Sequence, residues 1–473
     1  MKNLKVIMAA AEVAPFAKAG GLADVAGSLP PALKKLGCDV RLIMPKYGLI
    51  DEKKYKLKKL LSGVEIVSAK KKRKIDLWEG KLPGYNVKIY FVGNKEFFGR
   101  KDIYFGNNSE RFLFFSLAVS QVLPLIKFQP DIVHCHDFHT AMLINIIKAS
   151  KLYNSYYFST KFVYTIHNLN YQGVSELEVL STGNLSVDMQ QSLTKDAKDG
   201  DINFMAQGIV NADMVNTVSP TYAKEITTSA FGAGLNRVIK ANSDKIVGII
   251  NGLDLDFFNP AKDKLVKYKY DLTSISNKDK NKIFLQKKVG LPQDVKKTLV
   301  GVISRIVWQK GFNLITEDMI KDLDCQFVFL GSGQKKYENH LKKLAKKYPK
   351  KVSANMFFGI DLASHIYAGS DIFLMPSRYE PCGLGQMIAM RYGTVPVVRE
   401  TGGLADTVDA KVGFKFKEFT SVALKNALKK ALVVYNLDPQ KWKKIRANGM
   451  KKDFSWNKSA KLYFKMYKNA LKK

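Results

Sequence analysis

Short apolar runs alternate with longer amphipathic stretches along most of the chain. The runs span residues 4–11, 38–44, 86–92, 131–136, 161–166, 213–218, 245–250, 298–303, 326–330, 355–358 and 371–376. Such runs between helical patterns indicate buried parallel strands joined by helices. The pattern therefore predicts an α/β fold. It also predicts a basic, irregular region over residues 51–81 and helices over residues 421–473.

The stretch after the last run carries the strongest signal for a ligand site. It reads Ser377-Arg-Tyr-Glu-Pro-Cys-Gly-Leu-Gly-Gln386 and leads into an apolar helical pattern. A helix start offers backbone N–H groups and a positive dipole to an anion. Gly383 and Gly385 would let a phosphate approach the backbone closely, and the carboxylate of Glu380 can bind a sugar hydroxyl. Ligands of α/β proteins sit at such strand ends, so we expect a binding loop rather than an ordinary surface loop.

A second close-approach loop is expected after the first strand. Gly20 and Gly21 precede a helical pattern there, with Lys18 at the edge as a point charge. The spacing is not that of the dinucleotide-binding fingerprint. The five residues Gly-Gly-Leu-Ala-Asp at 20–24 recur at 402–406, so two similar α/β halves would place both loops beside one cleft.

Histidines cluster at the end of another predicted strand. His134, His136 and His139 surround Asp137, which raises the possibility of a metal site. In an extended strand His134 and His136 share one face while Asp137 points to the other, and no further ligand is evident. We therefore favour a polar active-site rim over a metal centre.

Two other strand ends carry polar or charged residues. One ends in His167-Asn168, and another ends in Ser304-Arg305 with Lys310 five residues later. Arginine can bind two oxygens of one anion and lysine adds a point charge, so the second loop suits a diphosphate.

Composition bounds the class of protein. A chain of 473 residues needs more than one core, and no apolar run approaches the roughly 20 residues that span a bilayer. The four cysteines are scattered, which indicates reduced thiols. The N-terminus lacks the layout of a signal peptide. We therefore expect a cytoplasmic protein.

The net charge of +34 favours anionic ligands and is compatible with nucleic acid or acidic lipid. The lysines are spread along the chain, however, and dense only at residues 70–74, 342–351 and the C-terminus. Spread lysines more often form a solvated surface than a binding site.

The motifs together resemble those of the bacterial glycogen synthases and plant starch synthases. The matching segments are Lys18-Ala-Gly-Gly-Leu22, His136-Asp-Phe-His139, Thr165-Ile-His-Asn168, Asn251-Gly-Leu-Asp254, Ser304-Arg305 with Lys310-Gly311, and Pro376-Ser-Arg-Tyr-Glu-Pro-Cys-Gly-Leu384. They cover essentially the whole chain in order. The resemblance implies a GT-B fold, an α/β architecture in which two Rossmann-like domains face each other across a deep cleft. We expect these domains over residues 1–240 (acceptor side) and 241–455 (nucleotide sugar), with a terminal helix over 456–473 that crosses back to the first domain.

The resemblance also implies an activity, which is transfer of glucose from ADP-glucose to the non-reducing end of an α-1,4-glucan with retention of configuration. It implies no metal and no cofactor. The residues it marks as catalytic are Asp137, His167, Arg305, Lys310 and Glu380. Those it marks as substrate-binding are Lys18, Gly20, Gly21, Asp24, Tyr104, Asn168, Asn251, Cys382, Gly383 and Leu384. The chain departs from the family pattern at Ala19, Gly385 and Ile388, the last standing where many retaining relatives carry a second glutamate.

Two alternatives stay open at this point. One is a GT-B enzyme that acts on a lipid or protein acceptor and docks on acidic membrane through residues 70–74. The other is a non-catalytic protein that binds glucan or nucleic acid. The expected partners are ADP-glucose and glycogen or an α-1,4-glucan primer, without nucleic acid or membrane. Donor preference between ADP-glucose and UDP-glucose, oligomeric state and acceptor length do not follow from the sequence.

Overall fold

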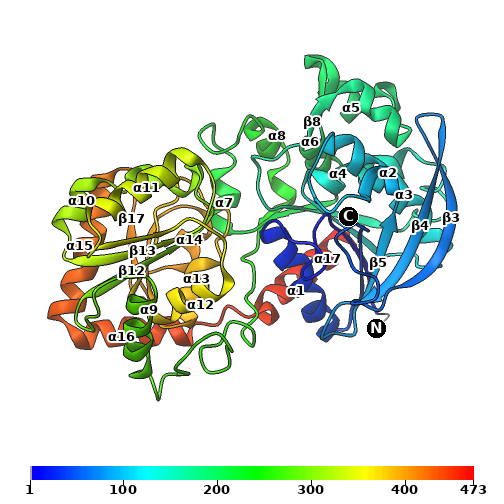
Figure 1. Ribbon diagram of the computed structural model, residues 1–473. Coiled ribbons are helices and arrows are strands. Elements are labelled where there is room, and N and C mark those ends of the chain that lie inside the picture. Colours follow the sequence, from blue (N-terminus) through cyan, green and yellow to red (C-terminus); the bar gives the residue numbers. More distant parts are fainter. Residues whose placement is uncertain (1–2) are drawn as a thin grey trace. The chain divides into compact units, whose positions relative to one another are not determined.

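The computed structural model describes residues 3–473, which divide into two compact units (Figure 1). The first unit comprises the chain up to Val218, Ala223–Gly252 and Trp456–Lys473, and the second comprises Ser219–Tyr222 and Leu253–Ser455. We expected residues 241–252 to belong to the second domain, but in this division they fall in the first unit. Each unit contains a sheet of mainly parallel strands together with helices, which confirms the predicted α/β class.

Within residues 3–473 the first unit forms a nine-stranded sheet in the order β11-β10-β7-β6-β1-β2-β5-β4-β3. Its strands are β1 (Lys5–Ala9), β2 (Asp39–Pro45), β3 (Lys58–Ser68), β4 (Lys71–Lys81), β5 (Lys88–Gly93), β6 (Ile132–His136), β7 (Lys161–Ile166), β10 (Met214–Thr217) and β11 (Ile246–Gly248). Strands β8 (Val174–Glu176) and β9 (Asp201–Asn203) form a small separate sheet. Because β1, β6, β7 and β10 are parallel, their carboxyl ends meet at one edge of the large sheet.

Helices connect these strands. They are α1 (Gly21–Lys35), α2 (Lys95–Phe98), α3 (Asn108–Leu125), α4 (Phe138–Ala149), α5 (Gln191–Asp196), α6 (Phe204–Asn211), α7 (Pro220–Glu225) at the division between the units, α8 (Asn236–Ala241) and α17 (Trp456–Ala470). Short 3-10 turns η1 (Leu177–Gly183), η2 (Val187–Met189), η3 (Ala197–Asp199) and η4 (Ser243–Lys245) complete the unit.

The region predicted to be irregular at residues 51–81 is instead a long antiparallel hairpin, β3 with β4, at the outer edge of the first sheet (Figure 1). Most side chains of β3 are exposed, so the apolar alternation that marks a strand is missing from this segment. Lysines on such an edge also hinder pairing with another chain. The strand predicted at residues 355–358 is β14, which ends earlier, at Asn355.

The second unit forms a six-stranded parallel sheet within the described chain, in the order β14-β13-β12-β15-β16-β17. Its strands are β12 (Thr298–Ile303), β13 (Cys325–Leu330), β14 (Val352–Asn355), β15 (Ile372–Met375), β16 (Val395–Arg399) and β17 (Phe414–Phe416). Its helices are α9 (Asn277–Lys288), α10 (Glu317–Asp322), α11 (Lys335–Lys347), α12 (Ile360–Gly369), α13 (Gly385–Arg391), α14 (Gly402–Thr407), α15 (Ser421–Leu437) and α16 (Pro439–Lys451), with 3-10 turns η5 (Trp308–Lys310) and η6 (Phe312–Leu314).

Strand β13 shows why this sheet is visible in the sequence as nearly continuous apolar runs. Phe327 and Phe329 belong to the larger core cluster, whereas Val328 and Leu330 belong to the smaller one. Successive side chains of a strand point to opposite faces, so both faces of β13 are buried. A strand buried on both faces is apolar at nearly every position, and the exception in β13 is Gln326, whose buried amide oxygen accepts a hydrogen bond from Gln286.

The last helix, α17, belongs to the first unit although unit two separates it in sequence from the rest of that unit. Tyr467 on α17 places its hydroxyl 2.8 Å from Nδ1 of His134 on β6. Asn216 on β10 donates from Nδ2 to the hydroxyl of Tyr463 at 3.1 Å. Thr165 on β7 links the two pairs, because its hydroxyl donates to Asn216 Oδ1 and lies 2.6 Å from His134 Nε2. The helix is therefore fixed directly to β6 and β10, and through Thr165 to β7, by buried polar contacts.

Candidate active site

Glu12, which follows β1, organises the Gly20-Gly21 loop of the first unit. Its side chain is buried, and Oε2 accepts the backbone N–H groups of Ala19 at 2.5 Å and Gly20 at 2.8 Å. Its other oxygen, Oε1, accepts a hydrogen bond from the hydroxyl of Tyr104. Burial first, and the carboxylate second, raise the pKa of Tyr104. The loop that leads into α1 is thus held by a carboxylate that the sequence did not single out.

Lys18, in this loop, forms an ion pair with Asp24 in the first turn of α1. Lys18 Nζ is 2.6 Å from Asp24 Oδ1, and both side chains are largely accessible. An exposed pair of this kind contributes little to stability. The lysine is therefore available to exchange its partner for an anionic ligand.

Asp137 joins the ends of β6 and β7. It has a positive φ of 53°, and its buried carboxylate accepts the backbone N–H of His167 at 2.7 Å and also that of Asn168. Burial raises the pKa of Asp137 to about 7, while the two N–H donors act in the opposite direction. A carboxylate with a pKa near neutrality can exchange a proton or a strong hydrogen bond with a ligand.

The His167 ring packs beside that of His136, with Nδ1 of His136 3.0 Å from Nε2 of His167. His139 packs against the rings of Tyr104 and Phe112. No cluster of three or more His, Cys, Asp or Glu side chains within residues 3–473 has a geometry that could hold a metal ion.

The second unit brings Lys310 and Glu380 together. Lys310 Nζ is 2.5 Å from Glu380 Oε2, both side chains are mostly buried, and the Ser377 hydroxyl donates to the same oxygen at 3.0 Å. The two loops run side by side, because Arg378 N–H donates to the Gln309 carbonyl at 2.8 Å. The pair thus connects the loop after β12 with the loop after β15.

Arg305, at the end of β12, is exposed, and its guanidinium has no hydrogen-bond or ion-pair partner within the described chain. The charge of Lys310 is matched by Glu380, whereas that of Arg305 is uncompensated. The loop after β12 therefore offers one free and one partnered cation to an anion.

Gly383 has a φ of +74°, and a Cβ there would lie 2.5 Å from Gln386 Oε1. Glycine is thus required for the turn that starts α13, next to the buried Cys382. Asn251, at the end of the first unit, is buried with its Oδ1 lacking a partner among residues 3–473. Such an atom is what a bound polar ligand would satisfy.

The structure groups the predicted residues within each unit. In the first unit, contacts link Lys18 with Asp24, and Asp137 with His167 and Asn168, and connect Tyr104 to the Gly20 loop through Glu12. In the second unit, Lys310 contacts Glu380, while Cys382, Gly383 and Leu384 continue the same loop. Arg305 and Asn251 stand without a side-chain contact to the other predicted residues of their units.

Glu12 and Ser377 were missed from the sequence as site residues, and His136 was expected only as part of a polar rim. Glu12 directly follows an apolar run, as Asp137 does, so the same strand-end rule could have identified it. The roles of His136 and Ser377 depend on contacts with His167 and Glu380, which tertiary structure alone brings close.

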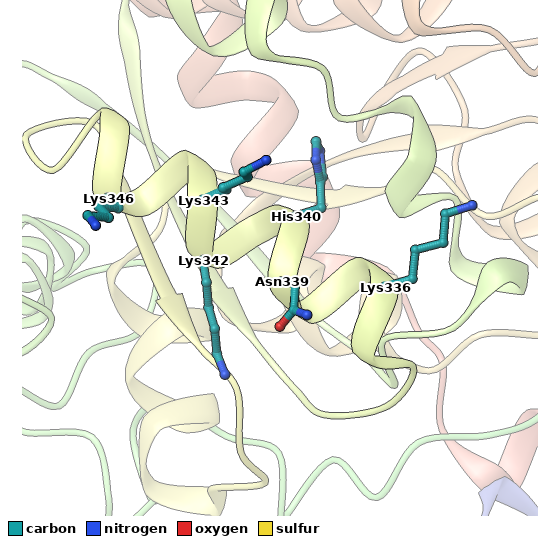
Figure 2. A pocket seen from close by; sticks show the side chains of 6 residues that line it. All are labelled: Lys336, Asn339, His340, Lys342, Lys343 and Lys346. Carbon is teal, nitrogen blue, oxygen red and sulfur yellow. The ribbon is translucent and has the colours of Figure 1, made fainter.

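A surface hollow on α11 is a poor alternative to these strand ends. It is lined by Lys336, Asn339, His340, Lys342, Lys343 and Lys346. All six side chains come from one helix and, as Figure 2 shows, point in different directions from it. Groups that diverge cannot coordinate one small ligand, so α11 presents a solvated basic face. No helix in residues 3–473 combines the length and apolar character that crossing a bilayer requires.

Comparisons with known proteins show which proteins this chain is similar to. The family "Starch synthase catalytic domain" matches residues 5–241, and "Glycosyl transferases group 1" matches residues 284–451. A glycogen synthase from Thermotoga maritima is 44% identical over 484 residues, with 99% of each chain covered. One from Moorella thermoacetica is 42% identical over 486 residues, which cover 100% of this chain and 98% of that one.

A solved structure of a related enzyme also matches the chain. The catalytic domain of starch synthase IV from Arabidopsis thaliana, bound to ADP and acarbose, matches with a TM-score of 0.92 at 34% identity, and all of both chains is covered. Sucrose-phosphate synthase from Thermosynechococcus elongatus, at 18% identity and a TM-score of 0.61, shares the fold alone. These matches confirm the predicted GT-B fold with two Rossmann-like domains and the predicted glycosyltransferase activity. By sequence and by fold, the chain belongs to the glycogen and starch synthase family of glycosyltransferases.

Proposed function

We propose that the chain transfers glucose from ADP-glucose to the 4-hydroxyl at the non-reducing end of an α-1,4-glucan, with retention of configuration. The names of its relatives support a glucan product, and the ADP bound to the plant starch synthase supports an adenine nucleotide as leaving group. The observation that carries the proposal is the cation pair after β12, in which Arg305 is free and Lys310 is held by Glu380.

The leaving diphosphate is the main electrostatic problem of the reaction. As the bond from the anomeric carbon to the phosphate oxygen breaks, negative charge grows on ADP and positive charge grows on the sugar. Arg305 and Lys310 would stabilise that negative charge through oriented donors. Glu380 keeps the Lys310 ammonium in place, and its carboxylate can accept a hydrogen bond from a sugar hydroxyl.

In this proposal the first unit contacts the transferred sugar and also contributes the substrate-binding loop. Asp137, His167 and Asn168 lie at adjoining strand ends, and Asn251 offers an unpartnered buried oxygen. Lys18, Asp24 and the two glycines of the Glu12-held loop form the remaining proposed substrate contacts. Tyr104 contributes by fixing Glu12.

Retention needs an explanation, because no carboxylate nucleophile was identified in the sequence. The position where many retaining relatives carry a second glutamate is Ile388, which is buried here. We propose that a phosphate oxygen of the leaving ADP takes the proton of the acceptor 4-hydroxyl. The new C1–O4 bond then forms on the face from which ADP departs, and the released ADP carries the proton.

The decisive experiment removes the free cation. For R305A we expect kcat/KM with ADP-glucose and glycogen to fall by about 10²- to 10³-fold, because a donor aimed at developing charge is lost. K336A, which removes an exposed lysine from α11, is the control and should keep its activity. Near-normal release of ADP by R305A would refute the leaving-group role.

A donor comparison tests the nucleotide. Purified protein with glycogen should release nucleoside diphosphate faster from ADP-glucose than from UDP-glucose at equal concentration. Preference for UDP-glucose, or turnover of a lipid acceptor but not of glycogen, would contradict the proposal. A cytoplasmic location also remains part of the proposal, because the cysteines form no disulfide within residues 3–473, which suits a reducing compartment.

A further inference from the structure

His136 and His167 face each other at the ends of neighbouring strands. His136 is the last residue of β6, and His167 follows β7 directly. Nδ1 of His136 lies 3.0 Å from Nε2 of His167, a hydrogen-bond distance, and the two rings are nearly parallel. One of the two nitrogens must therefore carry the proton and the other must accept it.

Burial favours the neutral form of both rings. Burial lowers the pKa of His167 to about 3 and lowers that of His136 well below its ordinary value. A neutral imidazole carries a single N–H, so each ring has one donor nitrogen and one acceptor nitrogen. Two tautomer pairs are then possible across the 3.0 Å contact.

The remaining nitrogen of His136 distinguishes the two pairs. Its Nε2 is buried and has no hydrogen-bond partner within residues 3–473. If His167 were the donor, His136 would carry its proton on Nε2 and leave a buried N–H unpaired. If His136 is the donor, only a lone pair is left unpaired. Orphaned buried N–H groups are rarer than under-satisfied acceptors, so His136 donates from Nδ1.

We infer that His136 is a positioning residue that holds His167 as the Nδ1–H tautomer, so that His167 is a hydrogen-bond donor toward substrate and not a general base. His167 is only partly buried, and its Nδ1 makes no hydrogen bond within residues 3–473. With Nε2 occupied by His136, the free Nδ1–H can only donate, for example to a sugar oxygen. This inference rests on the proposed function insofar as His167 contacts the sugar.

Backbone contacts support the same role. Asp137, the next residue, accepts the His167 backbone N–H at 2.7 Å, so consecutive residues hold the main chain and the ring of His167. His136 is itself fixed, because its own backbone N–H donates to the Thr140 hydroxyl at 2.6 Å. Because both the backbone and the ring of His167 are held, its free N–H group is pre-organised for binding.

The test reads the tautomer directly. The chain has six histidines, and two-bond ¹⁵N–¹H correlation spectra of histidine-labelled protein, with H167Q for assignment, distinguish protonated from bare ring nitrogens. We expect His167 to show a protonated Nδ1 and a bare Nε2 at neutral pH, without substrate. A protonated Nε2, or an imidazolium, would overturn the inference. Because no turnover is measured, this outcome is independent of the proposed reaction.

Variants at His136 provide the second measurement. In H136N the amide N–H group can replace the Nδ1 donor, whereas H136L has none. We expect H136L to move His167 toward the Nε2–H tautomer and to lower kcat by about 10- to 100-fold, and H136N to keep the tautomer and most of the activity. An unchanged His167 tautomer in folded H136L would refute the positioning role. If H136L fails to fold, the wild-type spectrum decides alone.

Discussion

The same five residues, Gly-Gly-Leu-Ala-Asp, start α1 in the first unit and α14 in the second. In the second unit the glycines are required by packing. Gly402 has a φ of +44°, and a Cβ there would lie 2.0 Å from the carbonyl oxygen of Glu380. A Cβ on Gly403 would lie 2.2 Å from the carbonyl oxygen of Cys382. No side chain fits at either position unless the backbone moves.

The first unit gives the opposite result. Gly20 is extended, and a Cβ on it would have Oε1 of Glu12 as its nearest neighbour, at 3.9 Å. Around Gly21 no atom of the described chain, its immediate neighbours aside, comes within 4 Å of the Cβ position. The fold does not need glycine at either position. One copy of the motif thus lets two loops pack together, while the other keeps a surface open, which is the loop that we propose to bind substrate.

The largest effect is expected where packing excludes a side chain. G402A should lower the free energy of unfolding by about 3–5 kcal/mol, because it adds a backbone clash to an unfavourable φ. Urea unfolding of the full chain, followed by circular dichroism and compared with G21A, measures this difference. Equal midpoints for the two variants would eliminate the contrast between the loops.

The next effect concerns how each loop is held. Gly403 N–H donates to backbone carbonyls of Glu380 and Pro381, whereas the first loop depends on the side chain of Glu12. E12A leaves two N–H groups unpaired and should cost about 2–3 kcal/mol. E12Q keeps an acceptor oxygen and is the matched control. Amide hydrogen exchange at Ala19 and Gly20 should accelerate in E12A only, and unchanged protection there would show that the loop has other support.

The smallest effect on stability is expected at Gly21, the first residue of α1. Alanine is the better helix former, so G21A should unfold at the same or slightly higher urea concentration, with a gain of at most about 1 kcal/mol. Activity should nevertheless fall at least about tenfold, because the methyl group occupies the open surface. Full activity in G21A would show that this surface is not used by substrate.

Much of the fold followed from single features of the sequence. Strand β13 was recognisable because both of its faces are buried, which favours a nearly continuous apolar run. Strands β3 and β4 were not, because lysines on an exposed sheet edge remove the alternation. Strand β16 merged with the apolar pattern of α13 before it, since only Tyr392-Gly393-Thr394 separates them.

The candidate site was likewise predictable only in part from the sequence. The motif residues were named through the family resemblance, and their roles stay predictions. Their partners were not visible, because the contact between Lys310 and Glu380 joins residues 70 positions apart, and that between His136 and His167 joins residues 31 apart. A sequence motif identifies chemistry on each loop, whereas the register between loops is set by packing.

The placement of α17 has a consequence for synthesis of the protein. His134, Thr165 and Asn216 are all made early, yet Tyr463 and Tyr467, which complete their hydrogen bonds, are translated only after residues 253–455 of the second unit. During elongation His134 and Asn216 therefore lack their tyrosine partners until the second unit has been made. A premature stop codon after Ser455 would therefore harm the half of the protein that was made first.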